Sequence, residues 1–138
     1  MRFAIKSLTT ILIINFIGMY FNFYGRFFWF DSILHLLGGF FVAWLFSDYL
    51  RNHLLPKSRT ANILIVVSAT ILIGVTWELA EYDANHIIRP RLQAVYGYNK
   101  VPDFQGDLDD TMKDILMDIF GGLIMAGFFV KVKNRSRN

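Results

Sequence analysis

The sequence contains no cysteine, and charged side chains are scarce in it. Without cysteine there is no disulfide framework, no thiolate metal site and no cysteine nucleophile. Charged residues make up 18% of the chain, against about 25% in ordinary soluble domains. No block of basic residues alternates with aromatic residues in a polar setting, so we do not expect a nucleic acid as a partner.

Apolar residues, in contrast, make up 54% of the 138 residues and occur in long runs. A helix that spans a bilayer needs about 20 mostly apolar residues. Four segments qualify, at about 3–24, 30–50, 61–82 and 111–130. The N-terminal run is long and lacks an Ala-x-Ala cleavage pattern, so we interpret it as a retained helix rather than a signal peptide. The sequence therefore predicts one all-α integral membrane domain, a four-helix bundle in a bacterial cytoplasmic membrane.

The basic residues predict how this bundle is oriented. If both termini are cytoplasmic, nine lysine and arginine residues fall inside and five outside, as the positive-inside rule requires of short flanking segments. Of the acidic residues only Asp48 lies inside, and the other ten lie toward the outside. Acids contribute little to topology, so this asymmetry has another cause. The long connection at about 83–110 would lie outside, over these acids, and the sequence leaves open whether it is an ordered lid or disordered.

Acidic and histidine side chains recur at helical spacing in the outer parts of three predicted helices. Asp31 and His35 are four residues apart, and Glu78 and Glu81 are three apart, so each pair shares one face of its helix. The last helix has acids at every fourth position, namely Asp110, Asp114 and Asp118. At a rise of 1.5 Å per residue, the three helices carry polar groups at a similar depth, roughly 6–12 Å inside their ends. We therefore expect these side chains to meet on the outer side of the membrane.

Such a cluster needs a source of compensating charge. Inserting one Asp at the centre of a membrane helix costs about 2.5–3.5 kcal/mol, unless the carboxylates are protonated, paired with bases or bound to a cation. Basic residues are few on this side, which favours a metal ion or a proton-sharing network over salt bridges. Oxygen donors with one imidazole suit Mg²⁺, Mn²⁺, Zn²⁺ or non-haem iron. We predict a divalent-metal site whose ligands are His35, Glu78, Asp114 and Asp118.

The remaining polar and small residues are assigned more local roles. We expect Asp31 to cap the N-terminus of its helix. Glu81 or Asp110 would act as a general base, and Arg89 and Arg91 on the loop would hold an anionic substrate. Small residues let helices approach closely in membranes, and we expect this of Gly38, Gly39, Gly121, Gly122 and Gly127.

Three segments resemble the VanZ-like small polytopic membrane proteins: FDSILHLLGGFFVAWLF, GVTWELAEYDAN and GDLDDTMKDILMDIFGGLIMAGFF. The closer likeness is to the uncharacterised YjdF-like branch, which shares the Trp-Glu and Asp-x-x-x-Asp features. The resemblance implies a small bundle in a family linked to glycopeptide-antibiotic resistance, and it points to Asp31, His35, Glu78, Asp114 and Asp118. This chain has Asp118 where VanZ proper usually has Asn, and it has an enlarged loop, so a resistance role does not follow.

Two functions of different classes remain open. The first is a metal-dependent membrane enzyme that acts on a lipid head group or a cell-envelope precursor at the outer leaflet, with a metal-bound water as nucleophile in a hydrolytic version. The alternative is a component of a proton or cation pathway, or an accessory subunit of a larger membrane complex, because intramembrane acids are equally characteristic of transport. The acids stop partway through the membrane, which counts against a complete channel. The bilayer is the expected partner in both cases, and other membrane subunits or further copies of the chain remain open.

Overall fold

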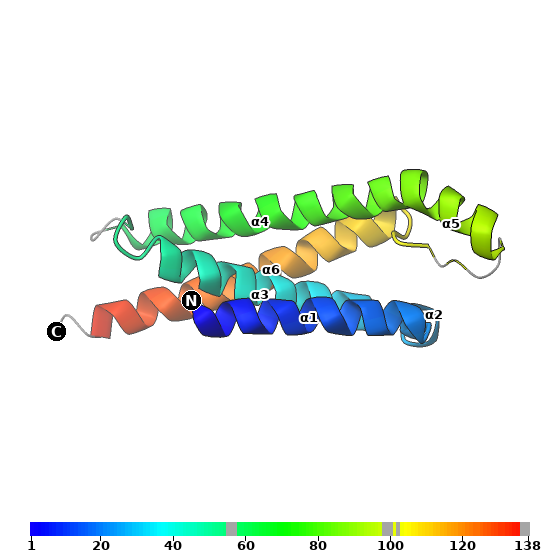
Figure 1. Ribbon diagram of the computed structural model, residues 1–138. Coiled ribbons are helices and arrows are strands. Elements are labelled where there is room, and N and C mark those ends of the chain that lie inside the picture. Colours follow the sequence, from blue (N-terminus) through cyan, green and yellow to red (C-terminus); the bar gives the residue numbers. More distant parts are fainter. Residues whose placement is uncertain (55–57, 98–100, 102, 136–138) are drawn as a thin grey trace.

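The computed structural model describes residues 1–54, 58–97, 101 and 103–135, and its regular elements are all helical. The long helices are α1 (Arg2–Tyr20), α3 (Phe30–Tyr49), α4 (Arg59–Asp83) and α6 (Leu108–Arg135). The N-terminus, the start of α4 and the last turns of α3 and α6 lie at one end of the bundle, which is on the left in Figure 1. The short α2 (Phe23–Arg26) and α5 (Arg89–Tyr96) lie at the other end. Successive long helices therefore run in alternating directions.

The helices have the length and the surface of membrane spans. Three stretches are long and apolar enough to cross a bilayer, namely α1, α3 and the helical segment 59–96. The 28 residues of α6 reach about 42 Å, enough for the fourth crossing that the sequence predicts. Large apolar side chains are exposed on every long helix, among them Phe16, Leu37, Leu72 and Phe120. A soluble monomer rarely exposes so much apolar surface, whereas lipid is a natural environment for it.

The first helix ends earlier than the sequence predicts. Instead of continuing to about residue 24, α1 ends at Tyr20, and Asn22 adopts a left-handed backbone conformation with φ of 55°. Asn tolerates this conformation better than most residues because its short side chain bonds locally. The chain then forms the single turn of α2 before α3 begins.

The region predicted as a loop at 83–110 begins as a helix. α4 continues directly into a π-helical turn, η1 (Ala84–Ile88), and then into α5. Pro90 lies at the start of α5, and the N–H of Arg89 bonds to the carbonyl of Ala84, five residues earlier. We attribute the wider turn to this proline, whose ring would clash with a carbonyl in a regular α-helix. The loop prediction is therefore wrong for its first half, and residues 98–100 and 102 of that region lie outside the described part of the chain.

α3 and α6 pack together through glycine. A Cβ atom on Gly39 would lie 2.2 Å from the carbonyl oxygen of Asp118, and one on Gly121 would lie 2.1 Å from the carbonyl oxygen of Leu36. The two backbones are therefore in contact, as small residues allow between membrane helices. The predicted close approach is confirmed at these two glycines. It is wrong for Gly127, where a Cβ would meet nothing within 4 Å.

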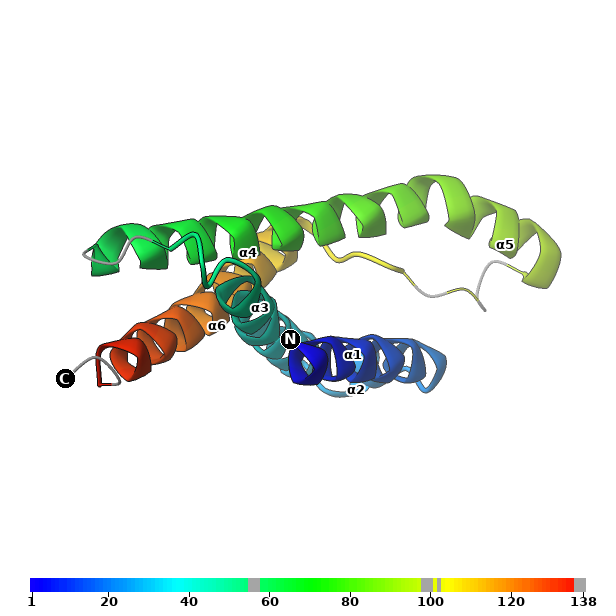
Figure 2. The same cartoon turned by 60° about the vertical axis from the view of Figure 1, so that its left-hand side comes forward.

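The two ends of the bundle differ in their packing. At the end with the termini, a buried apolar cluster joins α3, α4 and α6 through Ala43, Leu54, Val66, Val67, Met125 and Ala126. α1 lies against α3, and no Cα atom of α1 comes within 8 Å of one in α4 or α6 among the described residues. Figure 2 shows α1 set apart from α4, with α3 between them and behind. The polar residues gather in the other half of the bundle.

Cysteine labelling tests the orientation, because the natural chain has no cysteine. Asn52 in the turn after α3 and Tyr96 at the end of α5 are both exposed and lie at opposite ends of the bundle. We expect a membrane-impermeant maleimide added to intact cells to label Tyr96→Cys and to spare Asn52→Cys. Permeabilised cells should show both labels. The reverse pattern in intact cells would place the acidic cluster on the cytoplasmic side.

Candidate functional site

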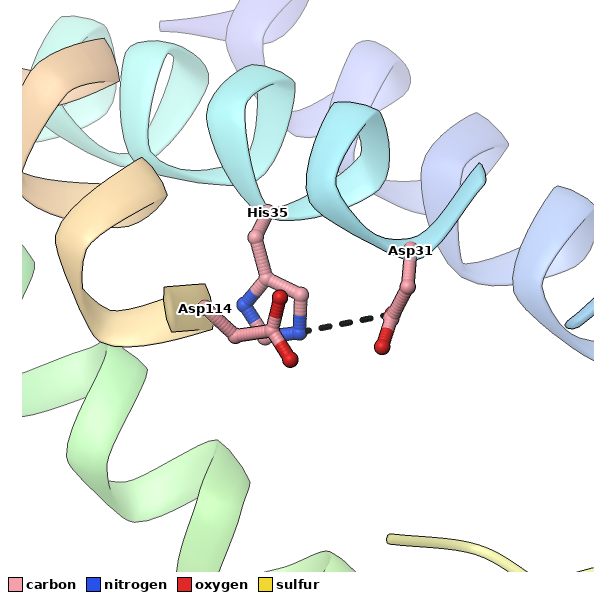
Figure 3. Close-up of side chains that lie close together, drawn as sticks. All are labelled: Asp31, His35 and Asp114. Atoms are coloured by element: carbon pink, nitrogen blue, oxygen red, sulfur yellow. Dashed lines mark ion pairs between the residues drawn. The ribbon is translucent and has the colours of Figure 1, made fainter. Parts of the chain in front are cut away.

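His35 lies at the centre of the polar cluster, on the second turn of α3, with only 7% of its surface exposed. Its Nε2 atom lies 3.7 Å from a carboxylate oxygen of Asp31, one turn earlier, and 3.7 Å from Oε1 of Glu78 on α4. Asp114 approaches from α6, and one ligand atom each from Asp31, His35 and Asp114 fit within 4.8 Å of one another (Figure 3). The same holds for His35, Glu78 and Glu81. Three helices therefore bring carboxylates to one imidazole.

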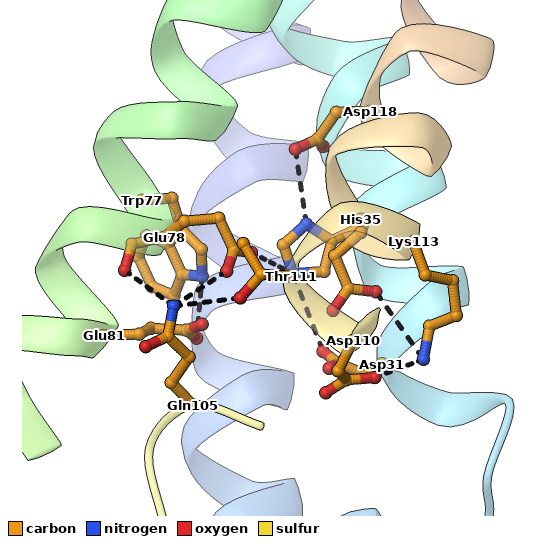
Figure 4. Close-up of polar contacts among 11 residues, drawn as sticks. Asp31, His35, Trp77, Glu78, Glu81, Gln105, Asp110, Thr111, Lys113 and Asp118 are labelled. Carbon is orange, nitrogen blue, oxygen red and sulfur yellow. Dashed lines mark hydrogen bonds and ion pairs between the residues drawn. The ribbon is translucent and has the colours of Figure 1, made fainter. Parts of the chain in front are cut away.

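Asp118 lies on the other side of the imidazole ring. Its carboxylate is 3.3 Å from Nδ1 of His35, as Figure 4 shows. Gly74 on α4 leaves room for this carboxylate, since a Cβ there would lie 2.3 Å from Oδ2 of Asp118. If Nδ1–H donates to Asp118, Nε2 keeps its lone pair directed at the other acids. Asp118 therefore occupies a position that orients the ring, at the nitrogen opposite to the one that faces Asp31 and Glu78.

Two carboxylate oxygens of the cluster have no hydrogen-bond partner within the described chain, Oε1 of Glu78 and Oδ1 of Asp114. Glu78 is 5% exposed and Asp114 2%. Among the described residues, Lys113 is the only lysine at the cluster; it forms an ion pair with Asp110 and lies 4.0 Å from Oδ1 of Asp114. An unpaired buried carboxylate oxygen is costly, and the cost rises with its charge. The described cluster is thus short of positive charge.

The segment that precedes α6 closes the cluster at the end of the bundle that carries α2 and α5. The Gln105 amide donates to the backbone oxygen and to Oε2 of Glu78, at 3.3 and 3.2 Å, and to the Thr111 hydroxyl at 3.0 Å (Figure 4). Asn85 in η1 holds the same segment, because it donates to the carbonyl of Gln105 and accepts from the N–H of Phe104. Neither Gln105 nor Asn85 is predicted from the sequence. Their spacing carries no signal, although π-turns such as η1 are frequent at functional sites.

A cavity of about 150 Å³ lies beneath this segment, and both predicted general bases line it. Glu81 accepts a hydrogen bond of 2.8 Å from the Trp77 indole, and Asp110 pairs with Lys113. Tyr24 of α2 also lines the cavity, and its hydroxyl has no partner within the described residues. Burial, together with the nearby acids, raises the pKa of this hydroxyl above its usual value, so it stays protonated. The cavity therefore combines acceptor carboxylates with a neutral hydroxyl that has no partner among the described residues.

Two predictions for the periphery of the site differ from what the structure shows. Trp29 is the N-cap of α3, so Asp31 does not have the predicted capping position and instead faces His35. Arg89 forms an ion pair with Asp103 at the rim of the cavity, and Arg91 is exposed on α5. Neither arginine lines the cavity. The observed positions of the two arginines therefore do not provide the predicted contact with a substrate in this cavity.

Comparison with known sequences matches residues 2–135 to the family described as "Predicted membrane protein (DUF2238)". The chain belongs to this family. An uncharacterised protein from Thermotoga maritima is 31% identical over 123 residues, which cover 84% of this chain and 55% of the relative. The chain thus spans about half the length of that relative. No solved structure matches it. The predicted location in a membrane is confirmed by the family and by the candidate spans of this DUF2238 chain.

Proposed function

We propose that this DUF2238 protein binds a divalent metal ion between α3, α4 and α6 and acts on the polar head of a lipid or cell-envelope precursor. The observation that carries this proposal is the convergence of Asp31 and Glu78 on Nε2 of His35, each at 3.7 Å. Two donors bound to one ion at about 2.1 Å lie roughly 3.0–3.5 Å apart. Side-chain movements of a few tenths of an ångström would therefore form the site.

The buried unpaired oxygens support the same conclusion. Oε1 of Glu78 and Oδ1 of Asp114 have no hydrogen-bond donor among the described groups, and a cation would compensate both. In this proposal Asp31, His35, Glu78 and Asp114 are the ligands. Asp118 fixes the tautomer of His35 by accepting a hydrogen bond from Nδ1, the ring nitrogen that does not face the metal. This arrangement is common at metal-binding histidines.

Once bound, the metal would supply Lewis acidity and a water of lowered pKa. Glu81, positioned by the Trp77 indole, is the better general base, because Asp110 is engaged by Lys113. The protonated Tyr24 hydroxyl is placed to donate to an anionic oxygen of a substrate. These groups would favour hydrolysis or transfer at a phosphate or carbonyl centre.

The depth of the site favours a lipid head group as substrate. His35 lies five residues after the start of α3, about 7–8 Å along the helix. The polar layer on each side of a bilayer is about 5–8 Å thick. The cluster would therefore lie near the boundary between head groups and hydrocarbon. The VanZ-like resemblance, with its link to the cell envelope, agrees with such a substrate and is part of the proposal.

A proton or cation pathway is the alternative use of the same acids. Such a path would have to cross the apolar cluster around Val66, Val67 and Met125, which closes the inner half of the described bundle. An accessory subunit would need a partner in contact with the cluster, yet the segment around Gln105 already covers it. Both observations favour the enzyme.

Metal analysis of the purified protein tests the proposal. We expect about one equivalent of a divalent metal in the wild type and almost none in His35→Ala. Asp118→Asn should keep the site but weaken metal affinity about 10–100-fold, because the His35 tautomer is no longer fixed. Asp109→Asn, an exposed acid at the same end of α6, is the matched control and should bind like the wild type. A metal-free wild type that conducts protons in liposomes would establish the alternative.

A further inference from the structure

A second cavity lies beside the polar one and is separated from it by His35. Its volume is about 150 Å³, and it is lined by α1, α3 and α4, with Asp118 of α6 at its floor. It lies where α1 packs on α3 without reaching α4, and Figure 2 shows the α1 ribbon set apart from that of α4. Its walls are mostly apolar, with side chains such as Leu12, Val42 and Ile73. Apart from Asp118, the lining lies within the three candidate membrane spans, so the groove would face hydrocarbon.

One polar group interrupts this apolar wall. Asn15 of α1 lines the groove, is 94% buried at a relative exposure of 6%, and makes no side-chain hydrogen bond within the described residues. It lies five residues before Tyr20 at the end of α1, and His35 lies five residues after Phe30 at the start of α3. The two side chains are therefore at about the same depth, roughly 7–8 Å inside the outer ends of their helices. An amide without a partner is costly in hydrocarbon, so Asn15 points to a ligand with a polar atom at this level.

We propose that the groove holds one acyl chain of an ester-linked membrane lipid and that the Asn15 amide donates a hydrogen bond to the ester carbonyl. This inference rests on the proposed function and names its substrate class. A lipid so placed has its chain in the apolar groove and its head group in the polar cavity, on either side of His35. His35 lines the groove, while its neighbours Asp31 and Glu78 line the polar cavity. The His35 side chain thus lies between the two cavities, with the groove on one side and the carboxylates of the polar cavity on the other.

The size and the chemistry of the groove select this occupant. A dry cavity of about 150 Å³ accommodates one small hydrocarbon, which corresponds to part of one chain and not to two chains side by side. The amide donor of Asn15 requires a hydrogen-bond acceptor next to the acyl chain of the lipid. An ester carbonyl provides this acceptor, whereas an isoprenoid chain has none at that position.

Lipid retention by the purified protein tests the groove. We expect native mass spectrometry of wild type in mild detergent, after incubation with a diester phosphatidylglycerol, to show one retained lipid per chain. Ile73→Trp fills the groove and should reduce that occupancy at least tenfold. Leu72→Trp is the matched control: it adds the same ring to the adjacent residue, which is 67% exposed and does not line the groove. It should retain lipid like the wild type.

The Asn15 contact has its own readout, measured with a diether phosphatidylglycerol that lacks both carbonyls. Wild type should prefer the diester about fivefold, the effect of one hydrogen bond, and Asn15→Leu should bind both lipids equally. Equal lipid retention in the two tryptophan variants, or loss of lipid from both, would contradict the proposed lipid site in the groove. A diester preference that survives in Asn15→Leu would overturn the proposed contact. Metal content is measured on the same samples, so failure of the metal site is distinguished from failure of the groove.

Discussion

A chelator should lower the melting temperature of the detergent-solubilised wild type by about 5–10 °C and scarcely change that of Glu78→Gln. A ligand present at 100 times its dissociation constant stabilises the folded state by about 2.7 kcal/mol. For a chain of this size, each kcal/mol corresponds to about 3 °C. Glu78 is buried with an unpaired oxygen beside His35, so its loss should remove most of the metal affinity. Once the metal affinity is lost, a chelator has nothing to remove.

The metal-free proteins distinguish a functional cluster from a structural one. Without a cation, Glu78→Gln removes a charge from a desolvated carboxylate among other acids, so the variant should be no less stable than the metal-free wild type. The amide oxygen of Gln can still accept the hydrogen bond from Gln105. If Glu78 instead belonged to a structural salt bridge, its loss would cost about 3–5 kcal/mol. That loss in both Glu78→Gln and Asp114→Asn, with no effect of chelator on the wild type, would leave only a structural polar core.

The helices and the meeting of the acids were predictable because each depends on spacing alone. Apolar runs of about 20 residues define membrane spans whatever surrounds them. A four-residue spacing puts Asp31 and His35 on one face, and an equal depth brings Glu78 and Asp114 to the same level. The structure brings these four side chains together. Whether they bind a metal stays a prediction.

The sequence could not predict most features that depend on a partner far away in the chain. Asp118 follows Asp114 by one turn, so spacing made them equivalent, yet the room beside Gly74 places Asp118 at the opposite nitrogen of His35. Arg89 was assigned to a substrate because no sequence signal reveals its pairing with Asp103. The helix beyond Asp83 was missed because the polar composition and Pro90 indicated a loop, whereas a π-helical turn lets the helix continue past the proline.

Replacing Gly121 by valine should destabilise the protein by about 2–4 kcal/mol, the largest loss that we expect from a single substitution away from the acids. A Cβ there would lie 2.1 Å from the carbonyl oxygen of Leu36 and 2.7 Å from the backbone nitrogen of Phe40. Both are backbone atoms of α3 and cannot rotate away, so the helices must separate. Overpacking in a tight interface typically costs 1–3 kcal/mol, occasionally more. Thermal unfolding in detergent measures the loss.

Gly127→Val is the matched control on the same helix, because a Cβ there meets nothing within 4 Å. It should change stability by less than about 1 kcal/mol, which covers the difference in helix propensity between the two residues. The Gly121 variant should also lose metal affinity, measured at a temperature where it remains folded. Asp114 and Asp118 belong to α6 and His35 to α3, so separating these helices widens the site. Equal effects of the two valines would show that the α3–α6 contact does not hold the bundle together. A destabilised Gly121 variant with intact metal affinity would show that the ligands do not depend on that contact.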